Sequence, residues 1–244
     1  MKSIGLLWLG VILFTVSAFA GDAPAGYSQS YTILLKGTPA GSEVVTEAKS
    51  AAGDLISTSE HELLVTDGLE TKRMTFSTKM VLSKSTGNPV SYAYRYTTGG
   101  TGDSYDVLVK DAQITRVLTK GGHTTESTMA IPINMVIVDF NVYHHYDYLI
   151  RRYDFKKGGR QIFANYVPII GNDIPLAVTY LGNAEIPIEK GSLSTKNYKI
   201  EFVGIWGGSL FADKDGRLVR LVVPAQDLEV VRKDLLPPEA GKDK

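Results

Sequence analysis

The chain has 244 residues, with 26 lysines and arginines against 26 aspartates and glutamates, so its formal net charge is +0. Hydrophobic residues make up 43% of the chain and charged residues only 21%, which excludes an intrinsically disordered protein. The balanced charge lacks the excess of basic residues that is typical of nucleic-acid-binding proteins, so we expect no nucleic-acid partner. The absence of cysteine excludes disulfides, thiolate metal sites and a cysteine nucleophile. The composition therefore predicts a folded protein and does not indicate its function.

Residues 1–20 have the layout of a secretory signal peptide. Lys2 precedes an apolar run from Ile4 to Val16, and small residues lead up to Ala20. The run of about 13 residues is shorter than the roughly 20 needed to span a bilayer, so we expect cleavage rather than anchoring. A lipid-anchored protein would need a cysteine where Gly21 stands. We therefore expect an exported protein, periplasmic or extracellular, with no integral membrane span after cleavage.

From Tyr27 onward, apolar and polar residues alternate in runs that are separated by glycine-bearing turns. We expect strands within residues 27–36, 42–50, 55–65, 69–82, 90–97, 105–109, 113–118 and 123–130 in the first half. In the second half we expect them within residues 161–168, 174–181, 184–189, 198–203, 210–211, 217–223 and 228–231. This pattern predicts a mainly antiparallel meander that forms one domain over residues 21–236, followed by a frayed tail at 237–244.

Two of the turns have compositions that also occur in ligand-binding loops. The glycine-rich loop from Thr98 to Asp103 could cradle a phosphate, but a strand follows it where a helix would be needed. The segment Asp213-Lys214-Asp215-Gly216 contains two aspartates, as calcium loops do, but the remaining ligand positions are missing. We interpret both segments as hairpin turns.

Residues 136–155 interrupt the alternation and predict one amphipathic helix, because their apolar side chains fall on about half of the helical circle. Asn134 or Asp139 could cap its start, and Gly158-Gly159 would stop it. If this helix covers a cavity, its apolar face supplies the ligand-binding residues; the alternative interpretation is an ordinary core. The candidate ligand-binding residues are Phe140, Tyr143, Tyr146, Ile150 and Tyr153.

The opposite face of the predicted 139–155 helix is polar. It carries Asn141, His144, His145, Tyr148, Arg151 and Arg152. Half of the chain's four histidines lie there, so the face could bind an anionic group or perform acid–base chemistry. The alternative is a solvated helix face. Adjacent histidines diverge by about 100° on a helix, so we expect no shared metal.

The rest of the chain offers no catalytic motif. There is no Gly-x-Ser-x-Gly and no His-Glu-x-x-His. His61 is expected on the surface of a strand, and the carboxylates form no pair that stands out. The sequence therefore favours a non-enzymatic protein that needs no cofactor.

The order of the elements resembles a known superfamily. A Gly-x-Pro-x-Gly turn at Gly37–Gly41 lies between the first strands, an Asp-x-Asn helix beginning at Asp139 lies mid-chain, and a second meander follows. The chain resembles uncharacterised secreted bacterial all-β domains related to the LolA/LolB-like periplasmic lipoprotein carriers. The resemblance implies a strongly curved, incomplete β-barrel covered by a helix. In the carriers, the concave face holds acyl chains.

Two functions of different classes are consistent with this sequence. The first is a non-enzymatic envelope protein that binds a lipid or another apolar ligand in a half-barrel cavity, which predicts an unfilled cavity under the helix. The second is a structural or interaction module that docks an envelope protein through a sheet edge or the 139–155 helix face.

Overall fold

The computed structural model describes residues 26–67, 70–98, 101–132, 134–189 and 191–236. The predicted signal peptide at residues 1–20 and the predicted tail at 237–244 lie outside the described residues, as do residues 99–100 of the glycine-rich loop.

One sheet of 14 strands, with every neighbouring pair antiparallel, makes up most of the described chain. Its first half comprises β1 (Tyr27–Leu35), β2 (Thr38–Lys49), β3 (Leu55–Asp67), β4 (Glu70–Leu82), β5 (Pro89–Thr98), β6 (Thr101–Lys110), β7 (Gln113–Lys120) and β8 (His123–Ala130). Its second half comprises β10 (Arg160–Phe163), β13 (Leu176–Ile188), β14 (Gly191–Phe202), β15 (Trp206–Ala212), β16 (Leu218–Val223) and β17 (Leu228–Arg232).

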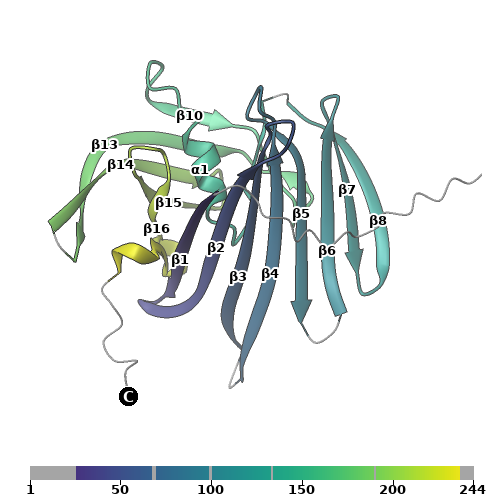
Figure 1. Ribbon diagram of the computed structural model, residues 1–244, viewed down its shortest axis with the longest axis horizontal. Coiled ribbons are helices and arrows are strands. Elements are labelled where there is room, and N and C mark those ends of the chain that lie inside the picture. Colours follow the sequence, from purple (N-terminus) through teal and green to yellow (C-terminus); the bar gives the residue numbers. More distant parts are fainter. Residues whose placement is uncertain (1–25, 68–69, 99–100, 133, 190, 237–244) are drawn as a thin grey trace, which may run out of the picture.

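The two halves join where β17 pairs with β1, and the sheet curls around its own concave face without closing (Figure 1). Its free edges are β8 and β10. The short 3₁₀ turns η1 (Pro224–Gln226) and η2 (Lys233–Leu235) flank β17. The predicted fold class is confirmed: an antiparallel meander curled into an incomplete barrel, with one small helix.

The second meander differs from expectation at several strands. Residues 161–168 were expected as one strand, but they form β10 and, in a separate sheet, Asn165–Val167. The strand expected at 198–203 begins already at Gly191. Residues 174–181 and 184–189 were expected as two strands, but β13 runs through both, with a bulge between Tyr180 and Gly182. Gly182 has a φ of 116°, a conformation that residues with a Cβ rarely adopt. The glycine that suggests a turn in the sequence therefore bends a continuous strand.

Residues 134–155, here called the central segment, lie inside the curl. They contain β9 (Val136–Ile137) and the only α-helix in the described chain, α1 (His145–Ile150). β9 pairs in parallel with β11 (Asn165–Val167), and β12 (Asn172–Asp173) completes a small three-stranded sheet. The predicted helix over 136–155 is therefore wrong for most of its length, because its first residues pair as a strand.

A single residue, Asn141, lies at the bend of the central segment between β9 and α1. Asn141 has a φ of 62°, in the left-handed region, which an α-helix cannot pass through. Asparagine tolerates this conformation better than most residues with a side chain. The chain therefore reverses at Asn141, and α1 begins only at His145.

Apolar side chains inside the curl form two clusters, one contributed largely by β1, β2 and β13–β17 and the other by β4–β7. The central segment contributes to both: Leu149 and Ile150 belong to the first cluster, and Val142 and Tyr148 to the second. All six residues of α1 are buried. The helix therefore has no solvated face, contrary to the amphipathic prediction. No helix in the described ranges has the length and apolarity needed to cross a membrane.

Candidate functional site

The curled sheet has two ends, which are set by the antiparallel pairing. The β1–β2 turn, the β14–β15 turn and η1 lie at the first end. The β2–β3, β4–β5 and β15–β16 turns lie at the opposite end. The central segment turns back at Asn141 near the first end, and Arg151 and Arg152 reach the opposite end.

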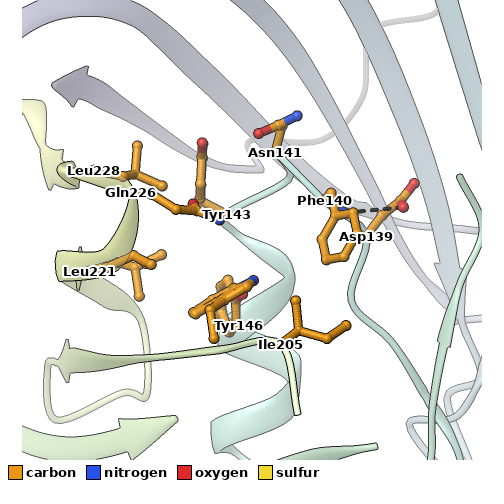
Figure 2. A pocket seen from close by; sticks show the side chains of 11 residues that line it. Asp139, Phe140, Asn141, Tyr143, Tyr146, Ile205, Leu221, Gln226 and Leu228 are labelled. Atoms are coloured by element: carbon orange, nitrogen blue, oxygen red, sulfur yellow. Dashed lines mark hydrogen bonds between the residues drawn. The ribbon is translucent and has the colours of Figure 1, made fainter. Parts of the chain in front are cut away.

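A cavity of about 310 Å³, here called the apolar pocket, lies at the first end. Its lining comprises Asp139, Phe140, Asn141, Tyr143, Tyr146, Ile205, Trp206, Leu221, Val223, Gln226 and Leu228. Figure 2 shows Leu221, Gln226 and Leu228 on one side and Phe140 and Asp139 on the other, with the two tyrosines between them. Most of these side chains are apolar or aromatic, so the pocket suits an apolar group.

Three of the predicted ligand-binding residues, Phe140, Tyr143 and Tyr146, line this pocket. The other two do not. Ile150 is buried in the core, and so is Tyr153, whose hydroxyl donates to the carbonyl of Gly159 at 2.7 Å. The sequence did not single out the pocket walls supplied by β15 and β16, because folding alone brings them against the central segment.

Large apolar side chains remain exposed around the mouth of the apolar pocket. Ile205 lines the pocket and is 55% exposed, and Val203, in the same turn, is 42% exposed. Leu35, which is 43% exposed, is the register partner of the lining residue Leu228. These three exposed apolar residues lie at the same end of the barrel as the apolar pocket.

A buried carboxylate on β2 holds the start of α1. Glu43 accepts the backbone N–H of Tyr143 at 3.1 Å and that of His144 at 3.4 Å, and the His144 ring Nδ1–H donates to it at 2.5 Å. The Nε2 atom of His61 lies 3.6 Å from the same carboxylate. Burial alone would raise the pKa of Glu43, but the facing histidines lower it below its ordinary value. Glu43 therefore acts as a cap supplied by a distant strand, since α1 has no side-chain cap of its own.

A second buried carboxylate on β2 anchors the other end of α1. Arg217 donates to both oxygens of Glu47, at 2.5 and 2.6 Å, and the hydroxyl of Tyr148 donates to Glu47 at 2.8 Å. Asp147, within α1, accepts the backbone N–H of Leu218 at 2.7 Å. These contacts fix the helix to β2 and to the start of β16.

Asp139 lies at the inner edge of the apolar pocket and is itself fully enclosed. Its carboxylate accepts the hydroxyls of Tyr92, at 3.1 Å, and of Tyr105, together with the backbone N–H groups of Phe140 and Ile169. Burial, only partly offset by these hydrogen bonds, raises the pKa of Asp139 to about 6. Its backbone N–H donates to Nδ1 of His145 at 3.3 Å.

The six residues predicted for the polar helix face do not form a common solvent-exposed surface. His144, His145 and Tyr148 are buried in these contacts, whereas Asn141 is exposed at the apolar pocket. Arg151 is exposed and Arg152 is half-buried, both at the opposite end. The six residues of α1 itself therefore present no face to solvent, since the sheet encloses them.

The expectation for His61 is also wrong, because His61 is 3% exposed and hydrogen-bonds to Ser59 through Nε2 at 2.7 Å. Burial lowers the pKa of His61 to about 4. The alternation of side chains along the strands would have predicted that His61 is buried. Glu43 and Glu47 share the inward face of β2 with Val45, and His61 shares the inward face of β3 with Ser59. Within the described ranges, these residues form no group that could hold a metal ion.

Comparisons with known proteins show the fold only. No family model and no curated protein sequence matches the chain. Among solved structures, the chain is similar to a beta-barrel-like protein of the domain of unknown function DUF1849 from Brucella abortus. The TM-score is 0.60 at 10% identity, over 85% of this chain and 94% of that chain. The similarity supports a barrel-like, all-β fold.

Proposed function

We propose that this protein is an exported, non-enzymatic envelope protein that binds a lipid or another apolar ligand in the apolar pocket. The observation that carries the proposal is an open apolar cavity at one end of the barrel, where the lining residue Ile205 and the nearby Val203 and Leu35 are exposed. Exposed apolar groups at the mouth of a cavity mark a surface where an apolar ligand enters.

The size of the apolar pocket narrows the kind of ligand. Its volume of about 310 Å³ lies at the lower end of the roughly 300–1,000 Å³ that is typical of small-molecule sites. The wall is aromatic on one side, where Phe202 packs between Phe140 and Trp206 with ring centroids 5.2 and 4.9 Å away. Such a pocket fits part of an acyl chain or a small apolar molecule, while a polar head would remain near Asn141 and Gln226 at the mouth.

Two sequence features support export and lipid binding. The layout of residues 1–20 is that of a signal peptide. The resemblance to the LolA/LolB-like carriers supports an acyl-chain ligand, because their concave face holds acyl chains. The further helices that line the cavity in those carriers have no counterpart among the described residues, which is consistent with a smaller ligand.

A non-enzymatic function is favoured by where the titratable groups lie. His61, His144 and His145 are buried beneath the central segment and do not line the apolar pocket. Asp139, the one carboxylate among the described lining residues, is saturated by four hydrogen bonds. These groups therefore organise the interior and leave no free acid–base pair facing a ligand.

Tryptophan fluorescence can test the proposal directly. The chain has two tryptophans, Trp8 in the predicted signal peptide and Trp206 in the apolar pocket, so Trp206 alone reports in the processed protein. We expect a brominated fatty acid to quench this fluorescence saturably. The variant Ile205→Lys should weaken the apparent affinity about tenfold, because an ammonium at the mouth disfavours an apolar ligand.

The matched control is Ile162→Lys, the same substitution on β10, where Ile162 is 62% exposed and does not line the pocket. It should bind as the unsubstituted protein does. Absence of saturable quenching, or equal weakening by both variants, would reject the proposal.

A second candidate function rests on the free edge at β8. This strand pairs only with β7 in the described chain, and its side chains are exposed on both faces along nearly its whole length. An extended segment of a partner protein could add to this edge as a further strand. The double variant Thr125→Lys/Ser127→Lys should then abolish cross-linking to the partner in the envelope, and undiminished cross-linking would reject this candidate.

A further inference from the structure

The opposite end of the barrel carries a second cavity, of about 600 Å³, here called the basic pocket. Four of its lining side chains are cationic: Lys49 from the end of β2, Lys84 from the turn that follows β4, and Arg151 and Arg152 from the end of the central segment. Leu55 and Tyr148 supply part of its apolar wall. Among the residues that the structure describes, none in this lining is a carboxylate, in a chain whose formal net charge is +0.

One of the two arginines of the basic pocket, Arg152, is held in place by hydrogen bonds to backbone carbonyls. The guanidinium of Arg152 donates to the carbonyls of Gly87, at 2.6 Å, and Met135, at 3.0 Å. Neutral carbonyls orient this cation without cancelling its charge. Arg151 lies 3.7 Å from the carboxylate of Asp147, whose nearer contact is the backbone of β16.

The two lysines of the basic pocket lack a counter-charge. Within the described chain, no carboxylate lies within ion-pair distance of the Lys49 or Lys84 ammonium groups. The nearby carboxylate of Asp54 accepts the backbone N–H of Lys84 at 2.9 Å. The two ammonium groups are therefore available to an anion from solution.

We propose that the basic pocket binds a phosphate group. The oriented guanidinium of Arg152, the guanidinium of Arg151 and two flexible ammonium groups around one cavity match a polyanion with several acceptor oxygens. The apolar wall would accommodate a carbon chain attached to that phosphate. The phosphate could belong to free inorganic phosphate or to the head of an amphiphile, and the two sources share the same contacts to the cations.

The basic pocket is separate from the apolar pocket, so this inference does not rest on the proposed function. The two linings have no residue in common, and they lie at opposite ends of β2. The buried contacts of Glu43 and Glu47 lie between them. A single extended ligand would have to displace these contacts, so we assign two independent sites.

Isothermal titration calorimetry with inorganic phosphate tests the proposal. The double variant Lys49→Gln/Lys84→Gln should weaken binding at least about tenfold, because it removes both unpaired cations. The control Lys110→Gln/Lys120→Gln makes the same change in charge at exposed lysines on β6 and β7 and should bind as the unsubstituted protein does. Equal urea-unfolding midpoints show that both variants are folded. Absence of phosphate binding, or equal binding by the two double variants, would overturn the proposal.

A parallel titration with octyl phosphate, below its micelle concentration, identifies the source of the phosphate. Tighter binding of octyl phosphate than of inorganic phosphate, lost in Lys49→Gln/Lys84→Gln, supports an amphiphile head. Equal affinities for both probes support the free ion. Octyl phosphate binding that is unchanged in the lysine variant would show that the alkyl chain binds elsewhere and would overturn the site.

Discussion

Buried carboxylates are the residues that determine how the interior of this barrel is organised. Glu43 is 0% exposed and accepts hydrogen bonds from two backbone N–H groups at the start of α1 and from the imidazole of His144. Burying a carboxylate without hydrogen-bond donors costs much free energy. Each of these donors replaces a hydrogen bond that water would make to Glu43 in the unfolded chain. The same reasoning applies to Glu47, which Arg217 and Tyr148 satisfy.

Replacing Glu43 with alanine should lower the free energy of unfolding by about 3–5 kcal/mol, because the two N–H groups and the His144 imidazole would remain buried without their acceptor. Glu43→Gln should cost less, since it keeps one acceptor oxygen. Urea unfolding followed by circular dichroism measures both effects. The control Glu126→Ala, at an exposed position on β8, should change stability by less than about 0.5 kcal/mol. A Glu43→Ala variant as stable as this control would contradict the assigned role.

Asp139 should make folding stability depend on pH. Burial raises its pKa from 3.8 to about 6, so the folded state binds this proton more tightly than the unfolded state does. The stabilisation that protonated Asp139 adds to the free energy of unfolding is therefore fully present below about pH 3.8. It is lost as the pH rises through about 6. His61, whose pKa is lowered to about 4, acts in the opposite direction over much of the same range.

The opposing effect of His61 is present both in the unsubstituted protein and in the Asp139→Asn variant. It therefore cancels when the free energies of unfolding of the two proteins are subtracted. Between about pH 4 and pH 6, the unsubstituted protein should lose about 1.4 kcal/mol of stability per pH unit relative to the variant. Urea-unfolding midpoints measured across this range give the difference. Parallel pH profiles would show that Asp139 titrates normally in the folded protein.

At the scale of elements, the strands were predictable and the central segment was not. Strands such as β2 and β4 show period-two alternation between glycine-bearing turns, a local property of the sequence. The helical spacing of apolar residues over 136–155 does not reflect an amphipathic helix with one buried face. The segment is enclosed by sheet on several sides, so apolar residues are needed all around it, and pairing of β9 with β11 outweighs helix propensity.

Asn141 should tolerate glycine better than a β-branched residue. Asn141→Gly preserves access to the left-handed conformation at a φ of 62°, so stability should change by less than about 0.5 kcal/mol. Asn141→Val should cost at least about 1 kcal/mol, because a β-branched side chain disfavours that conformation. Chemical denaturation of the two variants provides the measurement. Equal stabilities would mean that the chain does not need this conformation in order to reverse.

At the scale of the whole molecule, one continuous antiparallel sheet brings distant segments to the same end of the barrel. The apolar pocket combines residues of the central segment with β15–β17, and the basic pocket combines the turns after β2 and β4 with Arg151 and Arg152. The sequence identified Phe140, Tyr143 and Tyr146 through their apolar spacing. It could not identify Trp206, Leu221 or Lys84, because the strand register of the curled sheet, and not any local pattern, places them at these pockets.

The central claim is that the apolar pocket holds an apolar ligand, and native mass spectrometry tests it most directly. The full-length protein would be expressed with its own N-terminal segment, purified from the cell envelope without detergent and compared with the Ile205→Lys variant. The account predicts an added mass, identified as a lipid or another apolar molecule, that is present in the unsubstituted protein and strongly reduced in the variant. A spectrum that shows only the unliganded mass for both proteins, with no added mass after incubation with fatty acid, would contradict it.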